Sequence, residues 1–280
     1  MTFHVKHLLC ALALSCLPAW AGVEAVTIPD AGGGIELKGL LYRPEGRGPF
    51  PGIVMLHGCS GMWTRSGKPL PSYAFWAEHF RNLGYAALLL DSFGPRGQRE
   101  ICTHNERRIT PQQERASDAR AALEWFAGQA GVRRDSIHLA GWSNGGTSVL
   151  HALRAAGGKA EGKPGFRSAI AFYPGCAQLL KGAFMPSAPL LILVGGADDW
   201  TPAAKCAALQ QRAREAGAPV ELEVYEGAHH AFDRLSGSLR YRPDVRNPSS
   251  PTGWGAHVGP DPEARRKAVE RATAFFQRYR

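Results

Sequence analysis

The sequence predicts an α/β fold, in which helices cover both faces of a mainly parallel sheet. Short apolar runs alternate with amphipathic helical runs along the chain, which is the pattern of repeated strand–helix units. Polar side chains directly follow several of the apolar runs, and the carboxyl ends of parallel strands meet at one edge of a sheet. Residues 22–280 are enough for a single domain of this kind with a large core.

The first part of the chain predicts four strands and a helix. Residues 23–28 and 35–43 alternate apolar and polar side chains, so we expect an antiparallel pair at one edge of the sheet. Residues 53–56 and 85–90 are continuous apolar runs, as expected of strands that are buried on both faces. Between these two runs, Ser72 is the expected N-cap of an amphipathic helix.

The middle of the chain begins with an irregular segment, residues 92–110, whose length is typical of functional loops. Thr110 and Gln113 have the spacing of a capping box, with Pro111 at the first helical position, so they predict the start of a helix. The apolar face of that helix comprises Ala119, Ala122, Leu123 and Phe126. A strand is expected at residues 137–140.

The last part of the chain predicts three more strands and two more helices. Thr201-Pro202 and Asp261-Pro262 mark the expected helix starts. Residues 233–260 are rich in proline and glycine and show little periodicity, so they predict a long loop. The strands are expected at residues 168–173, 189–194 and 220–225.

A short motif, Gly141-Trp142-Ser143-Asn144-Gly145, joins a predicted strand to a helical run and has the form G-x-S-x-G. In this context the motif predicts a nucleophile elbow, a sharp turn that exposes the serine hydroxyl at the end of the strand. Glycine at both ends allows the turn because a Cβ atom there would clash. The alternative is a surface serine in a glycine-rich turn, but the flanking strand and helix favour Ser143 as a nucleophile.

A nucleophilic serine needs a neighbouring base, and the base needs an acid that orients it. In α/β-hydrolases the acid and then the histidine follow the serine along the chain. We expect Asp198 rather than Asp199 to be the acid, because Asp198 lies nearer the strand end and Asp199 is expected to point outward or to cap the next helix. We expect His230 rather than His229 to be the base, because Phe232 can pack and hold its loop.

A serine nucleophile also requires N–H donors for the oxyanion of a tetrahedral intermediate. The N–H of Asn144 is one candidate, since it lies at the start of a helix. The N–H of Cys59 is the second candidate, because it follows His57-Gly58 directly after a buried strand. A glycine-rich turn without a function is the alternative for this stretch, and His57 itself is expected to be structural.

Five stretches of the sequence together resemble the dienelactone hydrolase family. They are HGCSG (57–61), DSFGPRG (91–97), GWSNGG (141–146), DDWTP (198–202) and HAF (230–232). The likeness covers nearly all of residues 22–280, and it implies the α/β-hydrolase fold without a cofactor or a metal. The members that give the family its name carry a cysteine nucleophile. Ser143 therefore implies a general carboxylic-ester hydrolase that acts on small molecules.

The expected reaction is attack of Ser143 on an ester carbonyl, with His230 as the base and an acyl-enzyme that water hydrolyses. Residues 92–110 and 233–260 are expected to roof the site. Arg96 is a candidate for binding a substrate carboxylate, because a guanidinium binds a carboxylate bidentately. The alternative role for Arg96 is to brace its own loop.

Three alternatives to an esterase remain. A serine peptidase of the same fold would use the same three side chains. A hydrolase-like binding protein would have no need of an intact serine, histidine and aspartate. A metal site could use Cys102, His104 and the pair His229-His230, but this spacing matches no zinc pattern, so we expect no metal.

Residues 1–21 predict a secretory signal sequence. Lys6 lies in the n-region, residues 8–17 are apolar, and Ala19-Trp20-Ala21 is an A-x-A cleavage site. The apolar run is too short to span a membrane. Attachment of a lipid at Cys16 is a weaker alternative, because the usual leucine three residues earlier is absent. We therefore expect a periplasmic or secreted protein that is cleaved near Ala21 and is not inserted in a membrane.

Four cysteines follow the predicted signal, and an exported protein retains disulfides. Cys59 and Cys102 lie in loops that should leave the same sheet edge side by side, so we expect them to pair. Cys176 and Cys206 lie on neighbouring strand–helix units and are expected to form the second bridge. Four buried thiols are the alternative.

The chain has a formal net charge of +9. Basic proteins often bind nucleic acids or membrane surfaces. Here the basic residues are scattered among acidic ones, without a lysine-rich block or an interleaved aromatic stripe. The pattern indicates a solvated basic surface, and it does not support a nucleic-acid partner.

Overall fold

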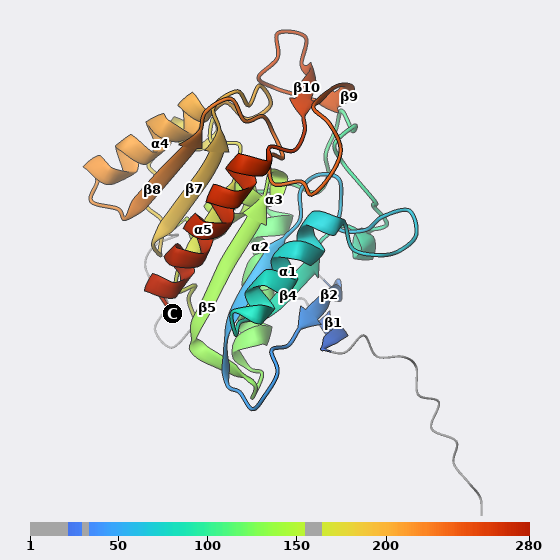
Figure 1. Ribbon diagram of the computed structural model, residues 1–280, viewed down its shortest axis with the longest axis vertical. Helices are drawn as coiled ribbons and strands as arrows, with labels where there is room; N and C mark the ends of the chain where they lie inside the picture. The colour runs from blue at the N-terminus through green and yellow to red at the C-terminus, as the bar shows by residue number, and fades with distance from the viewer. Residues whose placement is uncertain (1–21, 30–33, 155–163) are drawn as a thin grey trace, which may run out of the picture.

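The computed structural model describes residues 22–29, 34–154 and 164–280 (Figure 1). The predicted signal sequence at residues 1–21, with Cys16, lies outside these ranges. In the described part of the chain, no helix is both long enough and apolar enough to span a bilayer.

The main sheet has eight strands in the order β1-β2-β4-β3-β5-β6-β7-β8. These strands are β1 (Val23–Ile28), β2 (Leu37–Tyr42), β3 (Phe50–Leu56), β4 (Ala86–Asp91), β5 (Val132–Trp142), β6 (Ala169–Phe172), β7 (Leu190–Gly195) and β8 (Val220–Tyr225). Strand β2 runs antiparallel to both of its neighbours, and every pairing from β4 to β8 is parallel. The prediction of a mainly parallel α/β sheet is therefore confirmed.

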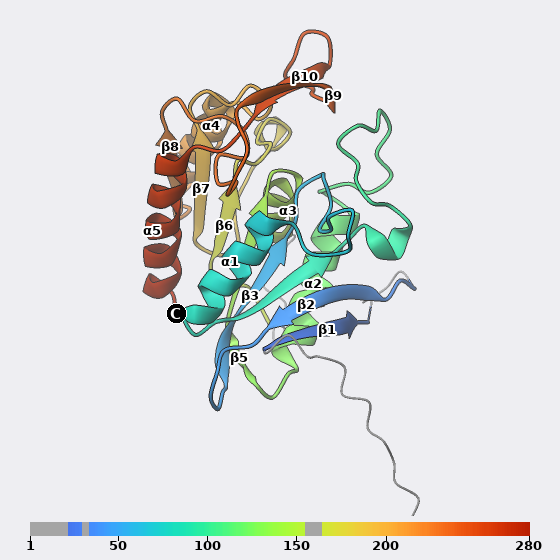
Figure 2. The same ribbon diagram turned by 45° about the vertical axis from the view of Figure 1, so that its right-hand side comes forward.

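In the described part of the chain, five α-helices cover the two faces of this sheet. They are α1 (Pro71–Asn82), α2 (Glu114–Ala127), α3 (Asn144–Leu153), α4 (Ala203–Glu215) and α5 (Pro262–Arg278). Helices α1 and α5 lie in front of the sheet, and α2 and α3 lie behind it (Figures 1 and 2). Helix α4 buries Cys206 and Leu209 in the same core cluster as α2 and α3.

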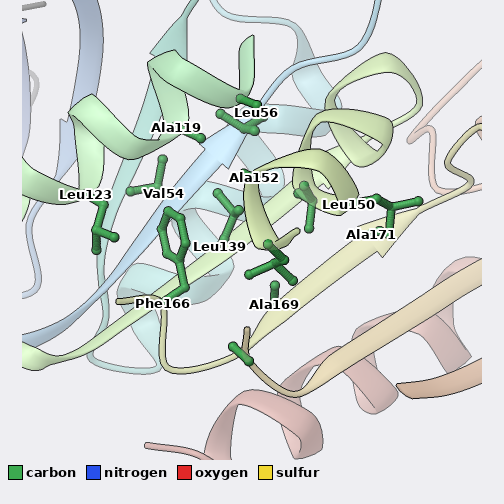
Figure 3. Packing of buried hydrophobic residues seen from close by; sticks show 14 of the residues in the cluster. Val54, Leu56, Ala119, Leu123, Leu139, Leu150, Ala152, Phe166, Ala169 and Ala171 are labelled. Atoms are coloured by element: carbon green, nitrogen blue, oxygen red, sulfur yellow. The ribbon is translucent and has the colours of Figure 1, made fainter. Parts of the chain in front are cut away.

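The alternation of side chains along each strand divides the core into two layers. On β3, Val54 and Leu56 point to the layer beneath α2 and α3, and Ile53 and Met55 point to the layer beneath α1 and α5. Figure 3 shows the first layer, in which Leu139 of β5 lies between the helices and the neighbouring strands. Because both faces are covered, the central strands have nearly continuous apolar sequences.

The prediction that residues 233–260 form a loop without strands is wrong. They contain β9 (Arg240–Arg246) and β10 (Trp254–Val258), which pair antiparallel. This ribbon lies beyond the end of the main sheet and buries few side chains, namely Val245, Ala256 and Val258. Its other side chains are exposed or partly exposed, so an alternating apolar pattern is missing from the sequence.

Two helix starts differ from the predictions, and one agrees. Helix α1 begins at Pro71 with Leu70 as its N-cap, so the predicted N-cap Ser72 is already inside the helix. Helix α2 begins at Glu114, whose carboxylate accepts hydrogen bonds from the N–H and hydroxyl of Thr110 at 2.7 and 2.8 Å. The capping partner of Thr110 is thus one residue later than predicted. Asp261 caps α5 as expected.

A buried histidine in the core predicts that the folded state loses stability at acidic pH. His138 of β5 is fully buried, with its Nδ1 atom 2.8 Å from the Ser168 hydroxyl. Burial, together with the charges of Arg167 and Arg133, lowers the pKa of His138 to about 3. In the unfolded chain the pKa of histidine is about 6.5. Between these two values the unfolded chain binds a proton that the folded protein does not, so stability falls as the pH falls.

We therefore expect His138→Gln to flatten the dependence of stability on pH. Between pH 6.5 and 4.5, the wild type should lose about 2 kcal/mol more unfolding free energy than the variant. Denaturant melts of both proteins across this range measure the difference. Parallel curves for the two proteins would show that His138 makes no such contribution.

Candidate active site

The G-x-S-x-G motif forms a tight turn between β5 and α3. Ser143 has φ 55° and ψ −116°, a conformation that is rare outside glycine. The N–H of Ser143 donates to the carbonyl of Phe172 at 2.9 Å, and its carbonyl accepts from the N–H of Thr147 at 2.8 Å. Hydrogen bonds on both sides therefore hold the serine in this strained conformation.

The two glycines of the motif are required by close backbone contacts. A Cβ atom at Gly141 would collide with the carbonyl of Gly145, and one at Gly145 would collide with the carbonyl of Leu56 at the end of β3. The first residues of α3 can approach β3 and β5 this closely only without side chains at these positions. The steric reason expected from the sequence is thus visible in the structure.

Ser143, His230 and Asp198 are joined by hydrogen bonds. The Nε2 atom of His230 lies 2.8 Å from the Ser143 Oγ, and its Nδ1 atom lies 2.7 Å from the Asp198 Oδ2. Asp198 and His230 are both buried, in the loops after β7 and β8. Three strand ends that are far apart in sequence therefore place their polar side chains together, as the parallel sheet predicts.

The Asp198 carboxylate is stabilised in its charged form. Its Oδ1 atom accepts from the N–H groups of Trp200 and Thr201 at 2.9 and 2.8 Å, and its Oδ2 atom accepts from the Thr201 hydroxyl at 2.9 Å. Burial raises the pKa of Asp198, but His230 and these hydrogen bonds outweigh burial, so the pKa is lower than usual. A charged carboxylate favours the His230 tautomer with the proton on Nδ1, which leaves Nε2 free to accept from Ser143.

The His230 ring is held between aromatic side chains. The ring centroids of Tyr173 and Trp200 lie 4.7 and 4.8 Å from that of His230. The Tyr173 hydroxyl donates to Asp233 at 2.6 Å, and Trp76 donates to the same carboxylate at 2.8 Å. Burial raises the pKa of Asp233. This network fixes Tyr173, and through it the imidazole.

The neighbouring candidates, Asp199 and His229, lie outside this hydrogen-bonded chain. Asp199 is paired with His257 of β10, at 2.7 Å from its Nδ1 atom and 2.9 Å from its backbone N–H. The His229 ring lies 5.7 Å from the His257 ring. Asp199 therefore points outward, which is one of the two roles expected for it. Its contacts with His257 hold the β9–β10 ribbon against the loop after β7.

The amides of Cys59 and Asn144 flank Ser143. Cys59 follows β3, Asn144 is the first residue of α3, and both line a cavity together with Ser143. In the described part of the chain, neither amide donates to a protein acceptor. The preceding amide, of Gly58, donates to the Tyr73 hydroxyl at 2.7 Å. Two residues that line the cavity with Ser143 thus have N–H groups without a protein acceptor in the described part of the chain.

Both expected cysteine pairs are disulfide-bonded in the structure. The Cα atoms of Cys59 and Cys102 lie 4.9 Å apart, and those of Cys176 and Cys206 lie 5.1 Å apart. The first bridge ties the loop after β3 to the segment 92–110. The second bridge ties the loop after β6 to α4.

Removal of the second bridge is expected to destabilise the protein without affecting the Ser143 loop directly. We expect the double variant Cys176→Ser with Cys206→Ser to lose about 2–4 kcal/mol of unfolding free energy, because the unfolded chain is no longer cross-linked. Urea melts measure this loss, and mass spectrometry of the alkylated, non-reduced protein counts free thiols. Four free thiols in the wild type would contradict both bridges.

Arg96 does not reach the cavities beside Ser143, so the expectation that it binds a substrate carboxylate is wrong. Its guanidinium donates twice to Asp118, at 2.9 and 2.8 Å, and once to the Ser92 carbonyl at 2.8 Å. The fork that could hold a substrate carboxylate is thus occupied by one from α2. Arg96 braces its own loop, which is the alternative role.

The residues of the alternative metal site, Cys102, His104 and the pair His229-His230, have other partners in the structure. Cys102 is in a disulfide, His104 contacts Glu100 at 3.7 Å, and His230 contacts Ser143 and Asp198. Among the described residues, no group of three or more histidine, cysteine, aspartate or glutamate side chains is arranged to hold a metal.

Two cavities adjoin Ser143, and both are also lined by Cys59 and Trp200. The smaller cavity has a volume of about 250 Å³, and the larger one has about 620 Å³. Segments 92–110 and 233–260 both contribute lining residues, in agreement with the expectation that they roof the site. The basic lining residues are Arg234, Arg240 and Arg242 in the smaller cavity and Arg107, Lys205 and Arg246 in the larger one.

Sequence reasoning missed several residues around the serine. The sequence predicts for Thr201 only the start of a helix, yet its N–H and hydroxyl groups also donate hydrogen bonds to Asp198. Asp233 lies three residues after His230, and this proximity was an available signal. Arg115 is fully buried and contacts Asn144 and the His57 carbonyl. A charged residue of an amphipathic helix normally lies on the surface, so nothing in the sequence predicts the burial of Arg115.

Comparison with known proteins identifies the family. The model of the dienelactone hydrolase family matches residues 37–280. The chain belongs to the dienelactone hydrolase family. Its members hydrolyse ester bonds, and this chain is a hydrolase of that kind. The resemblance expected from the five motifs is thereby confirmed.

Two curated proteins are similar to this chain at a modest level of sequence identity. A Bradyrhizobium protein assigned as a 2-oxo-3-(5-oxofuran-2-ylidene)propanoate lactonase is 26% identical over 207 residues, which are 69% of this chain and 77% of that protein. A Methylorubrum extorquens protein assigned as a carboxymethylenebutenolidase is 26% identical over 76% of this chain and 72% of its own length.

A solved structure shows the same fold. The crystal structure of a protein from Klebsiella pneumoniae, assigned as a dienelactone hydrolase, superposes with a TM-score of 0.66 at 18% identity. The match covers 92% of this chain and 99% of the other. At this level of identity the likeness establishes the α/β-hydrolase fold, and the roles of single residues depend on the geometry described above.

Proposed function

We propose that this protein is a serine hydrolase that cleaves carboxylic esters of small molecules through an acyl-enzyme. Ser143 is the nucleophile, His230 is the general base and Asp198 orients the imidazole. The observation that carries the proposal is the continuous hydrogen-bonded chain from Ser143 through His230 to Asp198, at 2.8 and 2.7 Å, beside two cavities. Such a chain converts a weakly nucleophilic hydroxyl into a reactive one.

In the first half of the reaction, the Ser143 Oγ attacks the ester carbonyl while the Nε2 atom of His230 takes its proton. The carbonyl oxygen becomes an oxyanion that accepts hydrogen bonds from the N–H groups of Cys59 and Asn144. His230 then donates its proton to the departing alcohol, and the acyl group remains on Ser143. Asp198 stabilises the imidazolium that forms.

In the second half, water takes the place of the alcohol. His230 removes a proton from the water, the resulting hydroxide attacks the acyl carbonyl, and the same two N–H groups stabilise the second oxyanion. Collapse of this intermediate returns the proton to Ser143 and releases the carboxylic acid. The cycle therefore needs no group other than the side chains and amides already named.

The charge of the larger cavity favours esters that carry a negative group. The larger cavity is lined by three basic side chains and, among the described residues, by no aspartate or glutamate. A cleft lined by charges of one sign concentrates ligands of the opposite sign. The name of the Bradyrhizobium relative, which specifies a propanoate, supports an anionic substrate.

The alternatives have less support. Nothing in the hydrogen-bonded chain distinguishes an esterase from a serine peptidase, but family membership favours esters. A binding protein without catalysis would not require the strained Ser143 or the buried Asp198. We also propose that the protein is exported after cleavage near Ala21, because two disulfides suit an oxidising compartment.

Covalent labelling tests the proposed function. A fluorophosphonate probe should label the wild type at Ser143, and a Ser143→Ala variant should remain unlabelled. A panel of p-nitrophenyl esters whose acyl groups differ only in a terminal carboxylate then tests the preference for charge. Absence of labelling together with absence of ester hydrolysis would overturn the proposal, and better hydrolysis of the neutral esters would overturn the charge preference.

A further inference from the structure

Arg115 is a fully buried cation close to Ser143. It lies in the first turn of α2, and its exposed fraction is 0%. Arginine is rarely buried completely unless it has specific partners. Burial lowers the pKa of Arg115 to about 10, with Asp118 opposing this effect, so the guanidinium remains charged near neutral pH. Retaining such a group in the core requires compensating contacts.

The contacts of Arg115 connect two loops. Its Nη1 atom donates to the Asn144 Oδ1 at 2.6 Å, and its Nη2 atom donates to the His57 carbonyl at 2.7 Å. The Phe93 ring lies beneath the guanidinium, 5.0 Å from its central carbon. One planar side chain thus links the start of α3 to the loop that follows β3.

These are the two loops that carry the unused N–H groups. The N–H of Asn144 belongs to the residue whose side chain Arg115 holds, and the N–H of Cys59 is two residues beyond His57. The donors come from separate segments that no other side chain of the described residues links in this manner. The guanidinium thus adds a side-chain link to the direct backbone packing of Gly145 against the carbonyls of Leu56 and His57.

We propose that Arg115 is a positioning residue that holds the two oxyanion donors, Cys59 N–H and Asn144 N–H, at the separation that the transition state requires. The proposal rests on the proposed function, because it assumes an oxyanion at these amides. The guanidinium is a rigid fork, and its two donors fix both loops at once. Oxyanion donors stabilise charge only when they are aimed at the oxygen of the transition state.

This role predicts an effect on kcat rather than on KM. The oxyanion exists in the transition state and not in the bound ester, so misplaced donors raise the barrier without weakening substrate binding. Loss of one oxyanion donor lowers kcat by about 100- to 1,000-fold. We expect Arg115→Gln to lower kcat by about 100-fold and Arg115→Lys by about 10-fold, since lysine keeps the charge and loses the fork.

The experiment compares these variants with Arg120→Gln, a control in the same helix. Arg120 contacts the His151 carbonyl at 3.3 Å and lies away from the cavities. Hydrolysis of a neutral p-nitrophenyl ester gives kcat and KM, and near-ultraviolet circular dichroism verifies the fold. Arg120→Gln should keep kcat within about threefold of wild type.

A second readout separates positioning from a structural role. A boronic acid forms a tetrahedral adduct with a reactive serine, so its affinity should fall in parallel with kcat in the Arg115 variants. The Asn144→Ala variant keeps its backbone N–H and loses the contact with Arg115. In a double-mutant cycle, Arg115→Lys and Asn144→Ala should lower kcat by less than the product of their separate effects.

The outcomes are distinct. A folded Arg115→Gln protein with kcat within threefold of wild type, or with a loss confined to KM, would overturn the inference. If Arg115→Gln does not fold, Asn144→Ala decides: a kcat unchanged by that variant overturns the inference, and a fall of about tenfold at constant KM supports it. A wild type without Ser143-dependent ester hydrolysis would instead overturn the proposed function.

Discussion

Replacement of Ser143 with alanine is expected to lower kcat for ester hydrolysis by about 10⁴- to 10⁶-fold while the protein remains folded. In the proposed mechanism the serine, the histidine and the aspartate act as a unit, so removal of the nucleophile removes most of what the unit contributes. The oxyanion donors and the cavities remain, which accounts for the residual activity. Initial rates on a p-nitrophenyl ester measure the effect.

Ser60 provides a matched control for this variant. It is a serine that lines the smaller cavity beside Ser143 but takes no part in the hydrogen-bonded chain. We expect Ser60→Ala to keep kcat within about tenfold of wild type. If Ser143→Ala retained activity within tenfold, the nucleophile would have to be another residue.

Asp198→Asn is expected to lower kcat by about 10⁴-fold, whereas Asp199→Asn should change kcat by less than tenfold. Asparagine keeps the shape of Asp198, but its amide can donate a hydrogen bond to the Nδ1 atom of His230. It therefore favours the tautomer with the proton on Nε2, which cannot accept the proton of Ser143. Asp199 contacts His257 on the β9–β10 ribbon and does not touch His230. Steady-state kinetics of the two variants under identical conditions give the ratio.

The adjacent histidines allow the same comparison. His230→Gln should lower kcat by a similarly large factor, and His229→Gln should have a small effect, because only His230 contacts Ser143. A larger loss in Asp199→Asn than in Asp198→Asn, or in His229→Gln than in His230→Gln, would reverse the assignment.

Much of the fold could be predicted from local patterns. The apolar runs of β3, β4 and β7 are buried on both faces, and that requirement alone makes their sequences continuous and easily recognised. The ribbon of β9 and β10 was missed because it packs few side chains, so burial imposes no alternation on it. The strength of the sequence signal thus follows the amount of buried surface.

The tight turn at Ser143 could also be predicted, because its environment is local. Gly141, Ser143 and Gly145 lie within five residues, and the turn depends on contacts that the glycines permit. From the sequence, the only ground for choosing Asp198 over Asp199 is that Asp198 lies one residue nearer the end of the strand. In the structure the distinction is long-range: one carboxylate meets the loop after β8, and the other meets β10.

By itself, the sequence determined the strand–helix order of the main sheet, the tight turn at Ser143 and the cysteine pairs. Each follows from the backbone path of a few neighbouring residues or from adjacent loops at one sheet edge. The tertiary structure alone decided the partners of the arginines. Arg96 meets Asp118 rather than a cavity, and Arg115 reaches Asn144 and the His57 carbonyl from a different helix. A long charged side chain is compatible with many surroundings, so only packing across distant segments selects its contacts.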